Sequence, residues 1–186
     1  TEWAISGRGD LRVLGDWKHY KDFESFRGDD PLWVIGGGVH AQQSEYGTPT
    51  TGETTEVRWT VDSSMEFGGG NIFVAAVGTH QDANSAEDIS QIGFLAQGGY
   101  FLTKDLEVIG RYEWANADAT GEEDLSLVTV GFNYFFRRHN LKFTSDVGYA
   151  FNAVGDTFDS SKAGWQVDSA GSGGQLVIRS QLQLLF

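Results

Sequence analysis

The chain has 186 residues, and its 26 acidic and 13 basic side chains give a formal net charge of −13, the wrong sign for binding nucleic-acid phosphates. It contains no cysteine, which excludes disulfides, thiolate metal sites and cysteine nucleophiles. Aromatic residues make up 13% and hydrophobic residues 40%, which argues against disorder. No run approaches the roughly 18 apolar residues that a membrane helix needs.

Apolar and polar residues alternate with a period of two along most of the chain, which is typical of strands with one apolar and one polar face. The alternation is strictest in the segments 3–17, 54–66, 106–114, 141–149 and 175–186. The apolar faces of these five segments carry Trp3, Ile5, Leu11, Val13, Val57, Trp59, Val61, Met65, Val108, Tyr112, Phe143, Val147, Leu176, Ile178 and Leu182.

Four less polarised strands are predicted between them, at 32–43, 71–81, 92–101 and 125–135, which makes about nine in all. The connections alternate in length. Tight turns are expected at 68–71, 102–105 and 137–140, and long polar external loops near 44–53, 82–91, 115–123 and 152–173. Short turns at one end and long loops at the other are typical of an outer-membrane barrel. The segment 18–30 breaks this pattern, because it is long at the periplasmic end, and it is interpreted as a helical turn or a plug-like segment.

Alternation alone does not separate a soluble barrel from a membrane barrel, because both need one apolar face. Two further features favour lipid. Opposed full charges occupy the middle of the polar faces, and aromatic residues gather near the expected strand ends, as expected for rings at two headgroup levels. These aromatic residues are Trp3, Trp59, Trp114 and Tyr149 at one end, and Trp17, Trp33, Phe73, Tyr100, Tyr134 and Phe143 at the other. The predicted fold is therefore all-β, an antiparallel transmembrane β-barrel in the bacterial outer membrane.

The charged residues of the polar faces are the candidates for a pore wall, because rings of such side chains set ion preference and guanidinium groups bind oxyanions. The basic candidates are Arg8, Arg12, Arg58, Arg111, Lys142 and Arg179. The acidic candidates are Asp10, Asp16, Glu56, Asp62, Glu107, Glu113 and Asp146. Because both signs alternate along the same strands, the wall is expected to carry a mixed field.

No catalytic or metal-binding motif is found. The four histidines, His19, His40, His80 and His139, are far apart in sequence, and the loop 152–173 lacks the pattern of a calcium-binding loop. Paired carboxylates such as Glu122 and Glu123 fall in an external loop rather than in a shielded pocket. The sequence therefore predicts no catalytic residue, no metal, no cofactor and no enzymatic activity.

Three segments resemble the phosphate-selective porin O and P family: GYFLTKDLEVIGRYEW at 99–114, LVTVGFNYFFRRHNLKFTSDVGYAF at 127–151 and RSQLQLLF at 179–186. Segment 3–17 is similar to the same family. The resemblance implies a sixteen-stranded homotrimeric porin, passing small hydrophilic or anionic solutes such as phosphate. Residues 1–186 would then be the C-terminal part of its barrel, since single-chain bacterial barrels close with an even number of strands. The terminal Phe186 resembles the signal that outer-membrane assembly machinery reads.

Two other interpretations stay open. The chain could be a small closed outer-membrane barrel of eight or ten strands that serves as an anchor or adhesin. It could also be a soluble β-barrel or sandwich that binds a small ligand such as a lipid or sugar, or that acts as an aromatic-lined glycosidase. The porin interpretation makes the distinguishing prediction that Trp59, Val108 and Leu182 lie on the outside of the sheet.

Overall fold

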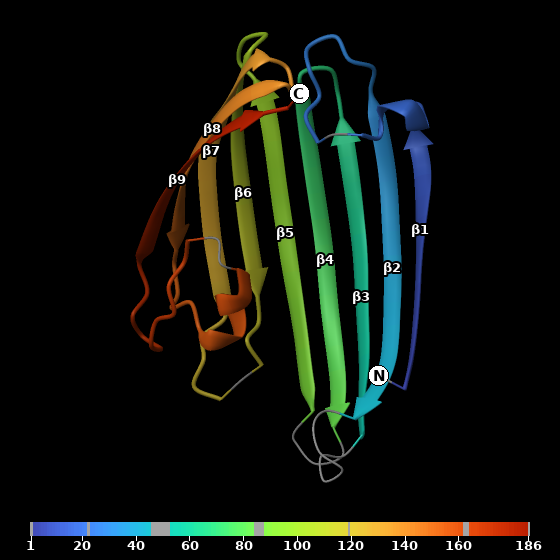
Figure 1. Ribbon diagram of the computed structural model, residues 1–186, viewed down its shortest axis with the longest axis vertical. Helices are drawn as coiled ribbons and strands as arrows, with labels where there is room; N and C mark the ends of the chain where they lie inside the picture. The colour runs from blue at the N-terminus through green and yellow to red at the C-terminus, as the bar shows by residue number, and fades with distance from the viewer. Residues whose placement is uncertain are drawn as a thin grey trace.

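In the part of the chain that the structure describes, nine antiparallel strands form one sheet, in the order of the chain, which confirms the predicted all-β fold and the strand number (Figure 1). The computed structural model describes residues 2–21, 23–45, 53–83, 88–118, 120–161 and 164–185. The strands are β1 (Trp3–Leu14), β2 (Leu32–Glu45), β3 (Glu53–Glu66), β4 (Gly70–Ala83), β5 (Ile89–Phe101), β6 (Leu106–Ala115), β7 (Leu125–Arg137), β8 (Leu141–Ala150) and β9 (Gln175–Leu184). Two short 3-10 helices, η1 (Trp17–His19) and η2 (Asp156–Ser161), lie in the connections. Within the described ranges, no helix has the length and hydropathy needed to cross a membrane.

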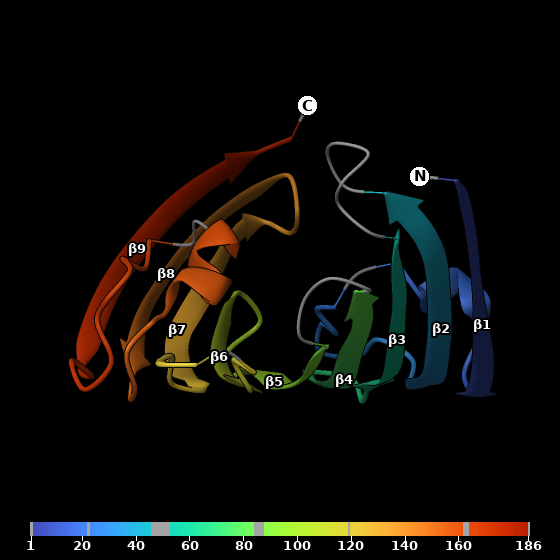
Figure 2. The same ribbon diagram turned by 90° about the horizontal axis from the view of Figure 1, so that it is seen from below.

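The sheet curves into a trough whose edge strands are β1 and β9 (Figure 2). The tight connections β3–β4, β5–β6 and β7–β8 share one end, at the top of Figure 1, here called the short-turn end. The long β1–β2 connection is at this end as well. The opposite end, here called the long-loop end, carries the β2–β3, β4–β5, β6–β7 and β8–β9 connections. Of the predicted loops there, most of 44–53 and the centre of 82–91 lie outside the described residues.

The sheet has reversed polarity, with polar side chains on its concave face and apolar side chains on its convex face. In β3 the carboxylates of Glu56 and Asp62 are buried, whereas the alternating Val61 is 54% exposed. The same holds in other strands, since Trp59 is 40%, Val108 38% and Leu182 67% exposed. A water-soluble sheet packs its apolar face inward. This arrangement is that of a transmembrane barrel, with lipid outside and water inside.

Two of the aromatic assignments need correction. Phe73 points into the trough, because it pairs with the inward-facing Ser64, and its ring packs edge-on against Phe23 at 5.1 Å. Trp59 lies in the middle of β3 rather than at its end, and its indole covers the Cα of Gly78 on the next strand. Outward rings at the short-turn end include Tyr100 and Tyr134, which are 52% and 39% exposed.

The start of the long β1–β2 connection is a capped 3-10 turn. Asp16 is the N-cap of η1, and its carboxylate accepts a hydrogen bond from the backbone N–H of Lys18 at 3.0 Å. This hydrogen bond lowers the pKa of Asp16, because it stabilises the ionised carboxylate. Asp16 lies beyond the end of β1, so its assignment to the polar wall was wrong.

After this turn the chain enters the trough. Residues 23–30, here called the strap, cross the concave face at the short-turn end and reach as far as β7 and β8. Phe26 of the strap joins Phe101 and Phe135 in a buried cluster. The plug-like interpretation of this region therefore describes its path. This path buries the ring of Phe26, which would otherwise expose a large apolar surface to water.

The last long connection also packs on the sheet. Phe158 of η2 and Trp165 pack against a cluster of Leu127, Ala150 and Val154. Glu123 fixes this connection to the neighbouring loop, since its carboxylate accepts hydrogen bonds from the backbone N–H groups of Ala153 at 2.9 Å and Gly171 at 3.0 Å. Among the described residues, the buried apolar clusters thus lie at the two ends of the sheet, and the charged side chains of Arg8, Asp62, Arg111 and Arg179 lie between them.

Candidate functional site: the polar inner wall

The first part of the wall is an ion cluster that spans three strands. Arg8 of β1 donates to Asp62 of β3 through two nitrogens, at 2.7 and 2.9 Å, and to Asp10 at 2.7 Å. The bridge passes over β2 at Gly36, where an added Cβ would overlap the guanidinium group of Arg8 and lie 2.8 Å from a carboxylate oxygen of Asp62. Gly36 is therefore a gap that lets charged side chains of the flanking strands meet.

Replacing Gly36 with alanine is expected to lower the free energy of unfolding by on the order of 2 kcal/mol, because the methyl group would separate Arg8 from Asp62. Gly37 is a matched control, since its added Cβ would meet only a backbone oxygen at 3.5 Å. Gly37→Ala should change stability by less than about 0.5 kcal/mol. Urea unfolding in lipid vesicles measures both values, and equal effects would contradict the gap role of Gly36.

The second part of the wall lies nearer the long-loop end. Glu56 accepts hydrogen bonds from Arg58 and from Gln42, each at 2.6 Å. Glu56 and Arg58, together with Arg8 and His40, line an open groove of about 980 Å³ that reaches to Thr157 and Phe158 of η2. The groove gives Arg58 access to water, since 63% of its side chain is exposed.

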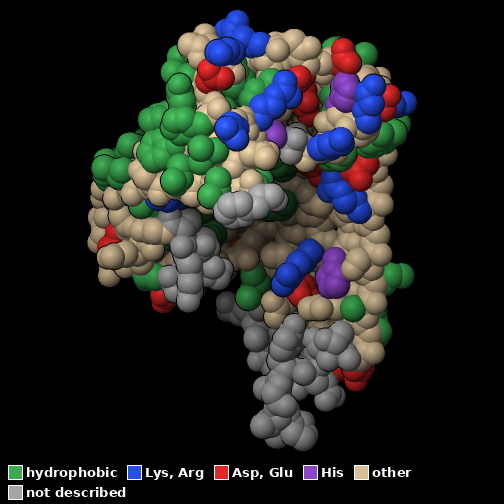
Figure 3. Space-filling view, turned by 45° about the horizontal axis from the view of Figure 1, so that its top comes forward, with side chains coloured by type: hydrophobic (Ala, Val, Ile, Leu, Met, Phe, Trp, Pro, Cys, Tyr) green, Lys and Arg blue, Asp and Glu red, His purple; other side chains and the backbone are tan. Residues whose placement is uncertain are grey.

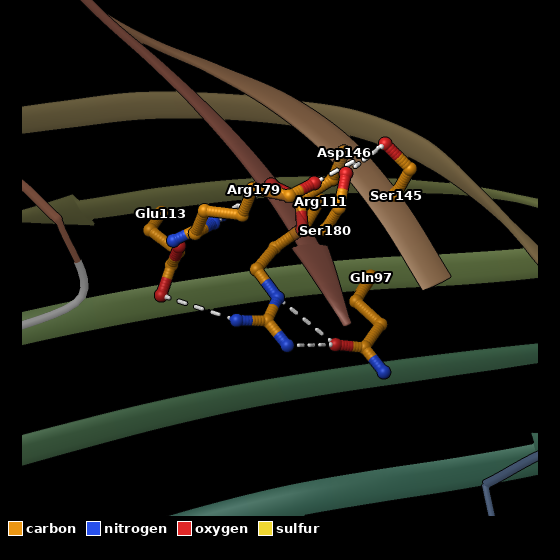
Figure 4. Close-up of polar contacts among 7 residues, drawn as sticks. All are labelled: Gln97, Arg111, Glu113, Ser145, Asp146, Arg179 and Ser180. Atoms are coloured by element: carbon orange, nitrogen blue, oxygen red, sulfur yellow. Dashed lines mark hydrogen bonds and ion pairs between the residues drawn. The ribbon is translucent and has the colours of Figure 1, made fainter. Parts of the chain in front are cut away.

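The third part of the wall contains two arginines with different partners (Figure 4). Arg179 of β9 donates to Asp146 of β8, with Nε and Nη2 at 2.8 and 2.7 Å from the same oxygen. Arg111 of β6 donates to the neutral amide oxygen of Gln97 at 2.7 and 3.0 Å, and the carboxylate of Glu113 lies 3.9 Å from its Nη1. The positive charge of Arg111 is therefore less compensated than that of Arg179.

Arg111, Asp146 and Arg179 line a smaller cavity of about 340 Å³, whose other side is formed by Phe23 and Glu24 of the strap. Figure 3 shows the hollow of the trough with the short-turn end brought forward and Lys and Arg side chains around it. The strap thus divides the inner surface into a cavity beside it and an open groove beyond.

Two predicted wall residues lie beneath the strap rather than on an open wall. Glu107 is 1% exposed, and its two oxygens accept hydrogen bonds from Asn71 at 2.9 Å and Asn133 at 2.8 Å. Lys142 forms an ion pair with Glu24 at 2.8 Å, and both side chains are 16% exposed. Their assignment as open pore-lining residues is corrected, because the strap covers this part of β6 and β8.

The other predicted residues are distributed along the face. Arg12 lies with its guanidinium 5.8 Å from the ring of Trp17, at the end of β1. Phe186, the predicted assembly signal, lies outside the described residues. Sequence reasoning missed Gln97, Asn71 and Asn133 as wall residues, although their alternation with outward apolar neighbours carried the signal.

The wall can surround polar solutes with alternating charges and amides in water. Within the described part of the chain, no three histidine, aspartate or glutamate side chains are grouped closely enough to hold a metal ion.

Comparison with known proteins gives a likeness of fold. No family model matches the sequence, and none of the curated proteins matches it either. The outer-membrane expressed OmpT of Vibrio cholerae has a TM-score of 0.55 and 16% identity, over 93% of this chain and 53% of that one. The trimer form of in-vitro folded OmpT, an outer membrane protein of Vibrio cholerae, has a TM-score of 0.51 and 20% identity, over 81% and 51%. The chain spans about half the length of these structures.

These likenesses correct one prediction and support others. The exclusion of enzymatic activity is corrected. The chain shares its fold with OmpT at low identity, and this fold alone does not settle whether a protein is an enzyme. The predicted location agrees with both structures, which are outer-membrane proteins of a bacterium. The resemblance to one porin family is supported only at the level of the barrel. The chain has the fold of a bacterial outer-membrane β-barrel protein.

Proposed function

We propose that the protein is an outer-membrane porin that forms a water-filled channel for the passive diffusion of small hydrophilic solutes, anions included. The observation that carries the proposal is the charged concave wall, where Arg8, Arg58, Arg111 and Arg179 lie in or beside cavities. A barrel that served only as an anchor could fill its interior with packed side chains. Here the middle of the wall borders open space of about 980 and 340 Å³.

The direct test is reconstitution of the complete protein in a planar lipid bilayer. A diffusion channel should give stepwise conductance that grows in proportion to the bulk conductivity of the salt solution. A protein that inserts and folds, yet gives no conductance steps, would reject the channel and favour the anchor or adhesin.

In this proposal, the preference of the channel for anions over cations depends on Arg111 and Arg179. Replacing both with glutamine is expected to lower the permeability ratio of chloride to potassium by roughly twofold, because positive charge leaves the cavity beside the strap. Reversal potentials in a salt gradient measure the ratio. The control is Lys104→Gln, which removes a charge from an exposed turn. The side chain of Lys104 is 86% exposed to solvent. An equal shift in the control, or none in the double variant, would contradict the role of the two arginines.

Phosphate as a solute and a homotrimeric assembly are finer parts of the same proposal. The family resemblance supports both, and one of the matched structures is described as a trimer form. The carboxylates of Asp10, Asp62 and Asp146 stand beside the arginines, so we expect a modest anion preference rather than a strict one. Competition of phosphate with chloride current distinguishes these two outcomes.

A further inference from the structure

The strap reaches across the inside of the trough instead of following its rim. Its two ends continue from β1 and into β2, yet Glu24 contacts Lys142 in β8 at 2.8 Å. Arg27 contacts the backbone carbonyl of Phe101, at the end of β5, at 2.5 Å. Because the strap connects β1 and β2 but contacts β5 and β8, it crosses the concave face at the short-turn end.

One aromatic side chain anchors the strap. Phe26 is 6% exposed, and its ring centroid lies 4.9 Å from that of Phe101 and 5.0 Å from that of Phe135. The guanidinium group of Arg138 lies 4.8 Å from the centroid of the Phe26 ring. The ring is therefore enclosed by groups from β5, β7 and the β7–β8 turn.

Polar contacts hold the strap at separate points on the wall. Arg27 donates to the carbonyls of both Phe101 and Leu102. The hydroxyl of Ser25, a fully buried residue, accepts a hydrogen bond from the backbone N–H of Gly68 in the β3–β4 turn at 3.1 Å. A moving gate needs a segment with few contacts. This segment has aromatic contacts to β5 and β7, an ionic contact to β8 and hydrogen bonds to the β3–β4 and β5–β6 turns, so it is held in place.

A small cavity lies beside the strap. The cavity of about 340 Å³ lies between Phe23 and Glu24 on the strap and Arg111, Asp146 and Arg179 on the wall. Since a water molecule takes about 30 Å³ in the liquid, this cavity holds on the order of ten waters.

We propose that the strap is a permanent constriction, which limits the size of the solutes that pass the short-turn end. The inference rests on the channel function proposed above and adds where and by which side chains size is selected. Phe23 and Glu24 form its strap side, and Arg111 and Arg179 form its wall side. The constriction is built by the connection at the short-turn end, not by the long loops.

The test is a variant without the strap. Leu14 pairs with Trp33, so β1 and β2 are already adjacent where the strap begins and ends. Residues 16–31 can therefore be replaced by an Asn–Gly turn without separating the two strands. The expected results are a single-channel conductance at least roughly twofold higher and faster entry of larger sugars into proteoliposomes, because the strap no longer crosses the channel.

A second variant keeps the length of the connection and loosens its anchors. Phe26→Ala combined with Glu24→Gln should give a noisy, fluctuating current, because the strap would remain but move. Lys104→Gln should leave the current as in the natural protein. A deletion variant that folds, shown by its heat-dependent gel mobility, but conducts as the natural protein does would overturn the constriction. The absence of conductance in the natural protein would instead overturn the channel function.

Discussion

Replacing Val61 with arginine is expected to lower the free energy of unfolding by about 2–4 kcal/mol, the cost of a cationic side chain on the lipid face near the bilayer midplane. Val61 is in the middle of β3 and is 54% exposed on the convex face. In a water-soluble barrel the same change would place a charge in water at almost no cost. The variant therefore tests which solvent covers the convex face.

Thr60→Arg is the matched control, because Thr60 precedes Val61 and points to the concave face with the inward-facing Val77 as its partner. An arginine there can extend into the wet groove, so we expect a change below about 1 kcal/mol. Urea unfolding in phospholipid vesicles, followed by tryptophan fluorescence, gives both values. A Val61→Arg protein as stable as the Thr60→Arg protein would mean that the convex face is not covered by lipid.

Phe135→Ala is expected to lower the free energy of unfolding by about 3–5 kcal/mol, the range for removing a buried phenylalanine ring. The ring of Phe135 is 2% exposed and lies 5.4 Å from Phe101 and 5.0 Å from Phe26 between centroids. It also lies 5.6 Å from the ammonium group of Lys142. Its loss would leave a cavity under the strap that the neighbouring strands cannot close.

The neighbouring Phe136 is the control, because it is 56% exposed on the convex face and packs only edge-on against Tyr134 among the described rings. Phe136→Ala should cost less than about half as much, since it leaves no enclosed cavity. The same vesicle unfolding assay compares the two. If Phe136→Ala is the more damaging change, the cluster beneath the strap does not stabilise the fold.

The faces of the strands could be predicted from the sequence, because successive strand residues point to opposite sides regardless of what lies around them. Val61 and Asp62 show this, since one lies on the lipid side and the other joins an ion cluster. The same rule placed Arg111, Asp146 and Arg179 on one wall. The alternation is less regular in β4 and β7, so it did not identify Asn71 and Asn133 as wall residues.

What could not be predicted depends on contacts between distant parts of the chain. The strand pattern correctly gave Glu107 an inward direction, but whether an inward residue faces water or a covering segment depends on where the strap goes. Phe73 is apolar on a polar face for the same reason, because it packs on Phe23. The role of Gly36 could not be predicted from its own strand. The side chains that meet over it, Arg8 and Asp62, belong to β1 and β3.

The strap has a consequence for the order of events during folding. Each strand pairs with the one before it, so the sheet can grow hairpin by hairpin from contacts close in sequence. The strap, in contrast, contacts residues 74 and 118 positions later in the chain, at Phe101 and Lys142. Closing such long loops is slow and can happen only after the distant strands exist. The barrel would therefore insert with its interior unobstructed, and docking of the strap would complete maturation.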